Sequence, residues 1–576
     1  MKYLLKKINK KLLIILFLAV LLRFGGLNWC LPHTPHPDEW NMAAAVTRLN
    51  WENKLNPQFF AYGQFPLYLT YFSARIYNFI PWINIKEIDI QEAVFFLRFW
   101  SATAGVGTVY LVYLISKRIL TTHYSLLASI LAAFTPGLIQ IAHFGTTESL
   151  LSFFFLLIIY LSFKILEKAK ARIFVFLGIV LGLSLATKIS ALIFTIPILM
   201  VIIFLLQRIL MKPGKRTKGS FLLLCNSLVA FATSLVFTLI TSPYLLLAYH
   251  ESKRTLLYET AVAAGNTPVF YTRQFINTTP VLFQLQKVFP YALGWPILIL
   301  GTLGIFLSLF LLIKPDKNKK TTLNLFASGK EIFSKAEHFK LQFLTLNFAL
   351  LTYFFSQAFL FCKWTRFMAP IFAFFPIFAA ILLSYLGNLR YLKFLLVVSC
   401  LPGLIFSSIY FQSDIRFAAS DWIYQNIPSN SQILFDTGNV VDIPISPPNH
   451  PNTPNFPNYR LTSFDFYHLD ENYELLPKLL NYLETSDYII IPSRRIFANH
   501  LRLADKYPLT AKYYSLLFSG KLGFTEIKTF VPLASKVLGD EKAEETFTVF
   551  DHPTIRIYQK VVPLGQNDYE NLFQYQ

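Results

Sequence analysis

The chain has few charged residues for its length. Only 15% of its 576 residues are charged, whereas a soluble domain usually carries about 25%. Its hydrophobic share is 54%, and its mean hydropathy is +0.46. This balance excludes a soluble enzyme, a disordered chain and a fibrous protein, and it predicts a polytopic membrane protein.

Cysteine is also scarce. The four cysteines, Cys30, Cys225, Cys362 and Cys400, lie in or beside apolar runs, and none belongs to a CxxC pair. A disulfide scaffold and a zinc finger are therefore excluded. The sequence contains no internal repeat, no P-loop and no HExxH motif.

Acidic residues are few in one set of loops. When loops are assigned alternately to the two sides of a membrane, one set holds 25 Lys and Arg but four acids, and the rest of the chain holds 27 basic and 28 acidic residues. The basic set comprises residues 1–11, 117–123, 164–172, 208–218, 314–340 and 387–393. The positive-inside rule places it in the cytoplasm. The net charge of +20 is thereby explained without a nucleic-acid partner.

Long apolar runs suit membrane helices, which need about 20 such residues each. About eleven candidate spans cover residues 12–28, 95–115, 122–141, 148–166, 172–187, 190–207, 219–241, 291–313, 341–361, 368–386 and 392–411. The first span lacks an A-x-A cleavage site, so we expect an uncleaved helix with a cytoplasmic N-terminus. The expected location is the plasma membrane, with several crossings.

The expected fold is an α-helical polytopic membrane domain over residues 1–411, with a small extracytoplasmic α/β domain over residues 412–576. Residues 29–94 and 242–290 are its outer loops. In the second domain, periodicity predicts helices at 416–427, 471–485 and 509–519 and strands at 433–435, 488–491, 525–531 and 554–559. Six prolines mark residues 443–458 as an irregular loop.

Two adjacent acids, Asp38 and Glu39, follow prolines just beyond the first span. Their side chains point in different directions, so one can face a substrate while the other caps a helix. The alternative is a helix N-cap at Asp38. A third acid, Glu148, lies between the third and fourth spans, where it needs a partner or a cavity; its alternative role is to complement a helix dipole.

Several cations lie at outer ends or at a break between spans, namely Arg98, Lys188, Lys363 and Arg366. Cations on the outer side oppose the positive-inside trend. They suit an anionic headgroup, a phosphate or a pyrophosphate. The alternative is that they extend to the interface without binding a ligand.

The order of these features resembles the GT-C class of glycosyltransferases, which use polyprenyl-phosphate sugars. It is most similar to prokaryotic relatives of protein O-mannosyltransferases and of lipid A aminoarabinose transferases. The segments that carry the resemblance are Pro37-Asp38-Glu39, Tyr62-Gly63-Gln64-Phe65-Pro66-Leu67-Tyr68, Leu97-Arg98-Phe99, Glu148, Gly182 to Lys188 and Lys363 to Pro370. It covers roughly residues 1–430.

The resemblance implies an enzyme, an inverting glycosyltransferase. Asp38 would be the general base, with Glu39 and Glu148 as further catalytic acids, and Arg98, Lys188, Lys363 and Arg366 would bind the donor phosphate. Some relatives hold a divalent ion between two acids and others need none, so no cofactor is certain; Asp38, Glu148 and His143 are the candidate ligands. The expected partners are a polyprenyl-phosphate sugar, membrane lipids and a glycan, lipid or protein acceptor.

One position departs from the resembling families. The aminoarabinose transferases have a donor-phosphate Lys where this chain has Gln64, which carries no charge, and this argues against lipid A as acceptor. His33 and His36 are interpreted as solvated loop residues.

The alternative functions are a transporter or flippase of a lipid-linked or anionic substrate, and a receptor or scaffold that uses the C-terminal domain. Outer acids and the lack of a repeat argue against a transporter, and a scaffold leaves the membrane acids unexplained.

Overall fold

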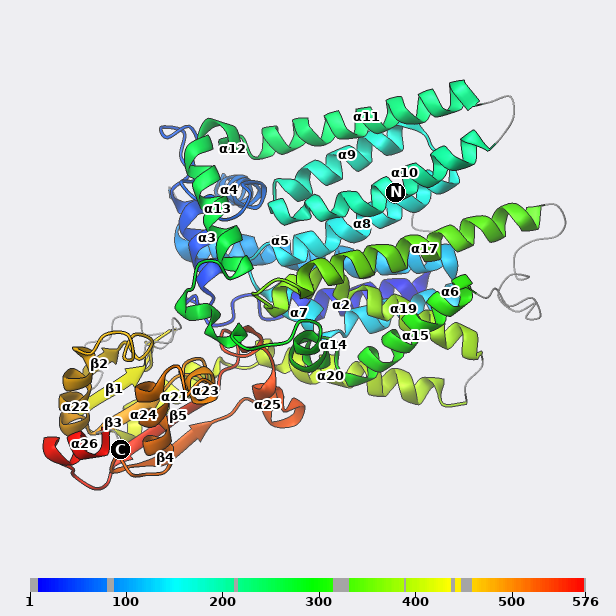
Figure 1. The fold of residues 1–576 in the computed structure, drawn as a ribbon. Coiled ribbons are helices and arrows are strands. Elements are labelled where there is room, and N and C mark those ends of the chain that lie inside the picture. Colours follow the sequence, from blue (N-terminus) through cyan, green and yellow to red (C-terminus); the bar gives the residue numbers. More distant parts are fainter. Residues whose placement is uncertain are drawn as a thin grey trace. The chain divides into compact units, whose positions relative to one another are not determined.

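A computed structural model of the chain describes residues 9–79, 87–211, 216–313, 331–387, 390–436, 441–446 and 458–573 (Figure 1). Residues 314–330 of the expected cytoplasmic segment and most of the expected irregular loop 443–458 lie outside these ranges. The chain divides into two compact units. Unit 1 comprises Met1–Leu27, Asp38–Thr267 and Thr279–Ser407, and unit 2 comprises Asn28–Pro37, Pro268–Thr278 and Ser408–Gln576.

Unit 1 consists of helices, which the long apolar runs form because a helix satisfies its own backbone hydrogen bonds. In chain order they are α2 (Lys10–Phe24), α3 (Pro37–Thr47), α4 (Phe65–Asn78), α5 (Ile90–Ile119), α6 (Thr122–Ala133), α7 (Pro136–His143), α8 (Glu148–Glu167), α9 (Ala171–Leu185), η1 (Ile189–Phe194), α10 (Thr195–Leu210), α11 (Arg216–Thr241), α12 (Tyr244–Leu247), α13 (Tyr249–Ala264), η3 (Gln284–Val288), α14 (Phe289–Leu293), α15 (Trp295–Ile313), α17 (Glu331–Ala358), η4 (Thr365–Met368), α18 (Ala369–Phe372), α19 (Phe374–Leu386) and α20 (Leu392–Phe411).

Several of these helices are long and apolar enough to cross a bilayer. Six qualify on their own within the described ranges, and two further pairs qualify if each bent pair is one span. The pair α6 and α7 bends by 54°, and η4 with α18 bends from α19 by 42°. The expectation of a multi-pass membrane protein is confirmed. Each of the eleven predicted spans falls on a helix or on a broken helix, although α9 has only 15 residues.

Breaks in the helices determine where polar side chains gather. Pro136 begins α7, which ends at His143, and α8 starts at Glu148. Between α9 and η1, the chain leaves helical geometry at Lys188. Because helix ends leave backbone groups unsatisfied, polar side chains are tolerated there better than in the middle of an apolar helix.

Unit 2 contains a mixed five-stranded sheet in the order β2-β1-β3-β5-β4. β1 pairs in parallel with β2 and β3, and β5 pairs antiparallel with β3 and β4. The strands are β1 (Gln432–Asp436), β2 (Arg460–Phe464), β3 (Tyr488–Ile491), β4 (Phe524–Phe530) and β5 (Ile555–Lys560). The helical elements are η2 (Phe270–Phe275), α21 (Ile415–Asn426), α22 (Leu475–Thr485), α23 (Phe497–Arg502), α24 (Pro508–Phe518), α25 (Leu533–Leu538), η5 (Asp540–Lys542), η6 (Glu545–Phe547) and α26 (Gln566–Phe573).

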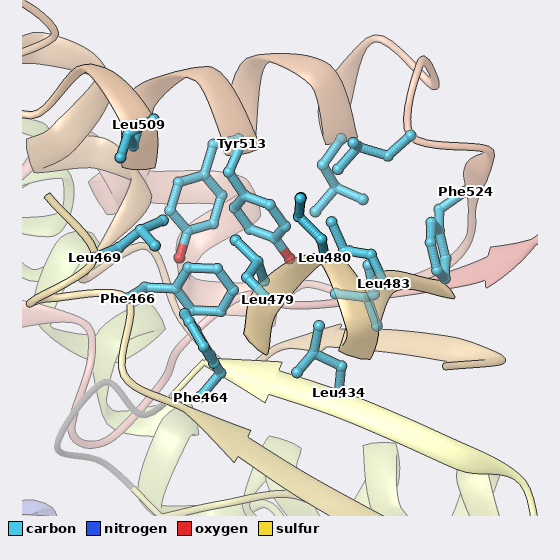
Figure 2. Packing of buried hydrophobic residues seen from close by; sticks show 14 of the residues in the cluster. Leu434, Phe464, Phe466, Leu469, Leu479, Leu480, Leu483, Leu509, Tyr513 and Phe524 are labelled. Carbon is cyan, nitrogen blue, oxygen red and sulfur yellow. The ribbon is translucent and has the colours of Figure 1, made fainter. Parts of the chain in front are cut away.

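Alternate residues of β1 face two separate cores. Leu434 belongs to the cluster formed with α22 and α24, which Figure 2 shows around Leu479, Leu483 and Tyr513. Its neighbours Ile433 and Phe435 belong to the cluster on the other face, under α21. The period of two residues in a strand produces this division, and it explains why the strand reads as a continuous apolar run.

The helices and strands predicted for the C-terminal region are confirmed, within a few residues at each boundary. Strand β2 and helices α23, α25 and α26 were not predicted from the sequence. The interpretation of His36 as a solvated loop residue was wrong, because His36 is buried against the ring of Phe550 at 4.5 Å. His33 lies in a loop and is half-buried, and its Nε2 lies 3.1 Å from the carbonyl oxygen of Ser446.

Candidate active site

Asp38 lies in the first turn of α3, and its carboxylate forms an ion pair with the guanidinium of Arg366. Both side chains are about one-fifth exposed, at 22% for Asp38 and 23% for Arg366. The guanidinium carbon of Arg366 also lies 4.8 Å from the ring centroid of Trp364. A planar cation held between a carboxylate and an aromatic face is well placed for an anionic ligand.

A second acid–cation pair joins the start of α8 to the break after α9. Lys188 Nζ donates to Glu148 Oε1 at 3.1 Å, and the hydroxyl of Thr147 donates to the same oxygen at 3.2 Å. The Glu148 side chain is 4% exposed and that of Lys188 is 16% exposed. Glu148 therefore has the partner that an acid at this depth requires.

Aromatic rings connect the two pairs. Lys188 Nζ lies 4.9 Å from the ring centroid of Tyr62 and 5.5 Å from that of Phe367. Because Phe367 directly follows Arg366, the same short segment touches both pairs. Four predicted site residues, Asp38, Glu148, Lys188 and Arg366, are thus brought to one place.

Backbone hydrogen bonds fix the Tyr62 ring next to Lys188. The N–H of Gly63 donates to the carbonyl of Thr187 at 3.0 Å, and the N–H of Phe65 donates to the carbonyl of Ala186 at 3.0 Å. A Cβ atom on Gly63 would lie 1.9 Å from the Ala186 oxygen. Glycine is therefore required at this close approach of two chain segments.

Glu39 and Arg98 form a separate pair that is buried completely. The guanidinium donates to both carboxylate oxygens, at 2.8 and 2.7 Å, and also to the Leu27 carbonyl at 2.8 Å. The N–H of Gly145 donates to Glu39 Oε1 at 2.6 Å. Neither side chain is exposed. The predicted roles, catalytic for Glu39 and phosphate-binding for Arg98, do not fit this burial, which indicates a structural link between α3, α5 and the turn before α8.

Lys363 and His143 are also bonded to the backbone. Lys363 is buried and donates to the carbonyl of Phe361 at 2.9 Å, and no ion pair joins it to an acid in the described ranges. The two ring nitrogens of His143 each lie 2.9 Å from a carbonyl oxygen, those of Ile139 and Gly25.

The candidate metal ligands Asp38, Glu148 and His143 are not assembled as a ligand group. Within the described part of the chain, no three His, Cys, Asp or Glu side chains come together in a way that can hold a metal ion. Asp38 and Glu148 each face a cation. The residues present therefore do not fit a bound divalent ion.

Several residues that shape the site had no role predicted for them from the sequence. Tyr353 of α17 donates from its hydroxyl to the carbonyl of Phe367 at 3.0 Å. Gln64 is buried, its Oε1 accepts from the N–H of Tyr244 at 3.0 Å, and its Nε2 has no hydrogen-bond partner among the described residues. Tyr62 and Gln64 lay in a quoted motif, but nothing around Tyr353 in the sequence distinguishes it from other helix residues.

A further acid approaches Lys188 from α13. Burial raises the pKa of Glu259, and the positive charge of Lys188 opposes that rise. Helix α13 therefore lies close enough to the site for its charges to act on Lys188. Taken together, the site offers two carboxylates, two cations suited to a phosphate, and aromatic faces beside the cations.

Comparison with known proteins gives a family for part of the chain. Residues 90–237, which extend from the start of α5 into α11, match the family described as dolichyl-phosphate-mannose-protein mannosyltransferase. The putative mannosyltransferase YkcB of Bacillus subtilis (strain 168) is 32% identical over 113 residues. That match covers 19% of this chain and only 16% of the curated relative.

Three solved structures align with between 43% and 98% of this chain. The oligosaccharyltransferase AglB from Archaeoglobus fulgidus, in complex with an inhibitory peptide and a dolichol-phosphate, has a TM-score of 0.50 at 14% identity and covers 88% of this chain and 72% of its own. ArnT from Cupriavidus metallidurans bound to undecaprenyl phosphate covers 98% of both chains, with a TM-score of 0.43 and 10% identity. The S. cerevisiae protein O-mannosyltransferase Pmt1-Pmt2 complex covers 43% of this chain and 34% of that chain, with a TM-score of 0.35 and 20% identity.

The likeness to AglB shows a shared fold, and the family match supplies the sequence relationship. Residues 90–237 match the family of the dolichyl-phosphate-mannose-protein mannosyltransferases, and this match confirms the predicted resemblance to glycosyltransferases that use a lipid-phosphate sugar. The matched range includes three of the six segments that carry the resemblance, namely Leu97-Arg98-Phe99, Glu148 and Gly182 to Lys188.

Proposed function

We propose that this chain is an integral-membrane glycosyltransferase that moves a sugar from a polyprenyl-phosphate donor to a glycan, lipid or protein acceptor on the outer face of the membrane. The observation that carries the proposal is that two acid–cation pairs, Asp38–Arg366 and Glu148–Lys188, both involve the short segment Arg366-Phe367, since the Phe367 ring lies beside Lys188. The match of residues 90–237 to a mannosyltransferase family supports the same chemistry.

In this reaction Asp38 is the general base. It takes the proton of the acceptor hydroxyl while that oxygen forms a bond to the anomeric carbon of the donor sugar. The bond between the anomeric carbon and the phosphate oxygen breaks, and its electron pair leaves with the polyprenyl phosphate. Attack from the face opposite the leaving group inverts the configuration.

Arg366 and Lys188 stabilise the phosphate that leaves. Each cation already lies beside a carboxylate and an aromatic ring, so it is positioned before the donor arrives, and little reorganisation accompanies the reaction. Glu148 orients Lys188 through their hydrogen bond. Charge-assisted contacts to a phosphate are stronger than neutral hydrogen bonds.

The test is a transfer assay with the purified chain in nanodiscs. The probe is undecaprenyl-phosphate mannose with a radiolabelled sugar, and a cell-envelope extract serves as acceptor. We expect release of undecaprenyl phosphate and label in a new product, and loss of both with Asp38→Asn. If no polyprenyl-phosphate sugar from a panel is cleaved while the label crosses the bilayer of proteoliposomes, the chain is a transporter and the proposal fails.

We further propose that all eleven spans cross the plasma membrane, with a cytoplasmic N-terminus and residues 412–576 outside. The basic loops support this orientation. In a cysteine-free background, an impermeant maleimide should label Lys521→Cys in intact cells and Lys170→Cys only after permeabilisation; both positions are exposed. Labelling of Lys170→Cys in intact cells would contradict the orientation.

A further inference from the structure

A pocket of about 580 Å³ opens between the loop before Tyr62 and helix α13. Its walls include Asn56, Gln58, Phe59, Phe60, Glu251 and Arg254. The volume lies within the range of about 300–1,000 Å³ that small-ligand sites occupy. None of these residues takes part in the acid–cation pairs described above.

The lining combines aromatic and polar groups. Phe59 and Phe60 line the pocket, and both are half-buried. The electron-rich face of an aromatic ring attracts the weakly positive C–H groups on one face of a sugar. The amides of Asn56 and Gln58 add hydrogen-bond donors and acceptors, which suit hydroxyl groups.

The two charges in the pocket are available to a ligand. Glu251 and Arg254 lie one turn apart on α13, and both are exposed. Neither side chain forms a hydrogen bond or an ion pair with another described residue. Since one negative and one positive charge cancel, the lining favours a neutral ligand that donates and accepts many hydrogen bonds, rather than a phosphate.

The loop that carries the two phenylalanines is held in an unusual conformation. Lys54, Leu55 and Gln58 have φ between 49° and 59°, a region that residues other than glycine seldom adopt. The hydroxyls of Tyr244 and Tyr68 donate to the carbonyls of Lys54 and Leu55. Such conformations persist where surrounding contacts fix them, and they occur often at ligand sites.

The pocket adjoins the candidate active site along both walls. Ala61 lines the pocket, and the next residue, Tyr62, has its ring 4.9 Å from Lys188 Nζ. The other wall is α13, whose Glu259 interacts electrostatically with Lys188. A molecule bound in the pocket can therefore extend toward the two acid–cation pairs.

We propose that this pocket binds a neutral sugar unit of the acceptor, so that the acceptor is a carbohydrate or carries one next to the reacting hydroxyl. This inference rests on the proposed function, because it assigns the acceptor class of the same site. Phe59 and Phe60 stack on the sugar, Arg254 donates to its oxygens, and Glu251 accepts from its hydroxyls.

The experiment measures binding alone. Saturation-transfer NMR on the full chain in nanodiscs uses methyl glycosides of mannose, glucose and N-acetylglucosamine as probes, with inorganic phosphate and a short Ser/Thr peptide as competitors. We expect at least one glycoside to bind, and Phe60→Ala and Arg254→Gln each to weaken it about tenfold or more. Lys253→Gln, with the same charge change at an exposed position of α13 that does not line the pocket, should change it less than twofold.

The inference is overturned if no glycoside binds, if all variants bind equally, or if phosphate or the peptide displaces the glycoside from this pocket. Melting temperatures of the variants identify loss of fold, and Phe59→Leu then serves as a milder variant. The binding experiment contains no sugar donor. If the chain transfers sugar but binds no glycoside, only the assignment of this pocket is wrong, and the proposed function stands. If the chain binds a glycoside but cleaves no donor, the proposed function is wrong, and the pocket is still a sugar-binding site.

Discussion

The guanidinium of Arg366 is ion-paired with the carboxylate of Asp38, although 328 positions separate them in the chain. The two side chains that the proposed reaction assigns to phosphate and to acceptor therefore neutralise each other. A phosphate that binds Arg366 competes with Asp38 for the same guanidinium. The carboxylate that it displaces is then available to accept a proton, which links donor binding to activation of the base.

Replacing Asp38 by Asn tests the base directly. Asp38 lies within the first turn of α3 and is not its N-cap, because the helix begins at Pro37. Asn keeps the size of Asp and removes its charge, so expression and insertion should be normal, while the rate of transfer should fall by about 10²–10⁴-fold, the usual contribution of a general base. The measurement is the transfer rate at saturating donor. A variant that keeps more than about half of the wild-type rate would remove Asp38 from the mechanism.

Replacing Arg366 or Lys188 by Ala tests the phosphate contact. Each change removes a charge-assisted hydrogen bond worth about 1.5–3 kcal/mol, so the KM for the polyprenyl-phosphate sugar should rise by about one to two orders of magnitude. Lys253→Ala, on an exposed face of α13, is the matched control. Wild-type kinetics of both variants at limiting donor would show that the two cations do not bind the donor.

Much of this fold can be predicted because apolar runs of about 20 residues leave few alternatives to membrane helices. Short apolar strands between amphipathic segments likewise indicated the second domain. Edge strand β2 escaped prediction because four of its five residues, Arg460 to Ser463, are not buried. Without a buried face, a strand has no alternating pattern to detect.

The site itself was only partly predictable. Asp38 and Glu39 are adjacent in sequence, and nothing in the sequence indicates that one is partly exposed and the other completely buried. That difference arises from tertiary partners, Arg366 for the first and Arg98 for the second. Arg98 was predicted to bind phosphate because a charged residue is rare in an apolar segment. A buried counter-charge explains the presence of such a residue equally well.

Gly63→Ala should lower activity without touching an ionisable group. The added Cβ would meet the Ala186 oxygen at 1.9 Å, so the loop must move away from Thr187 and carry the Tyr62 ring from Lys188. Overpacking of this kind costs about 1–3 kcal/mol. We expect a raised donor KM with little change in membrane insertion.

Gly219→Ala is the control for this prediction, because its Cβ would meet only the methyl group of Ile209 at 3.1 Å. Equal kinetics of the two variants would contradict the positional role of Gly63.

Glu39 and Arg98 should contribute to stability and not to donor binding. Removing one partner of a buried ion pair costs about 3–5 kcal/mol, whereas an apolar replacement of both is often close to neutral. Glu39→Gln and Arg98→Met should each lower the melting temperature in nanodiscs. The double variant Glu39→Leu with Arg98→Met should lose less than the sum of the two. A stable Arg98→Met protein whose donor KM rises tenfold would restore Arg98 to the phosphate site.

A buried network in unit 2 predicts how that domain responds to pH. His552 Nδ1 lies 2.5 Å from Asp551, its Nε2 lies 3.1 Å from Asp540, and the Tyr410 hydroxyl donates to Asp551 at 2.7 Å. Burial alone favours the neutral ring, but the two carboxylates outweigh it and raise the pKa of His552 to about 10. Burial alone would likewise raise the pKa of Asp540, but His552 and Arg494 lower it below 3.8.

The signs of these two shifts fix the pH window. Protonated His552 stabilises the fold fully below pH 6.5, the ordinary pKa of histidine, and this stabilisation is lost as the pH rises toward 10. Ionised Asp540 stabilises the fold fully above about pH 3.8, the ordinary pKa of aspartate, and this stabilisation is lost as the pH falls below that value. Stability of the domain should therefore be greatest between about pH 4 and 6.5 and fall by a few kcal/mol toward pH 10. Hydrogen exchange of residues 540–560 in the full chain measures it. His552→Gln should be less stable at pH 6 and should lack the decline above pH 6.5, since it has no proton to lose. A wild-type profile that is flat from pH 6 to 10 would mean that His552 is neutral in the folded domain.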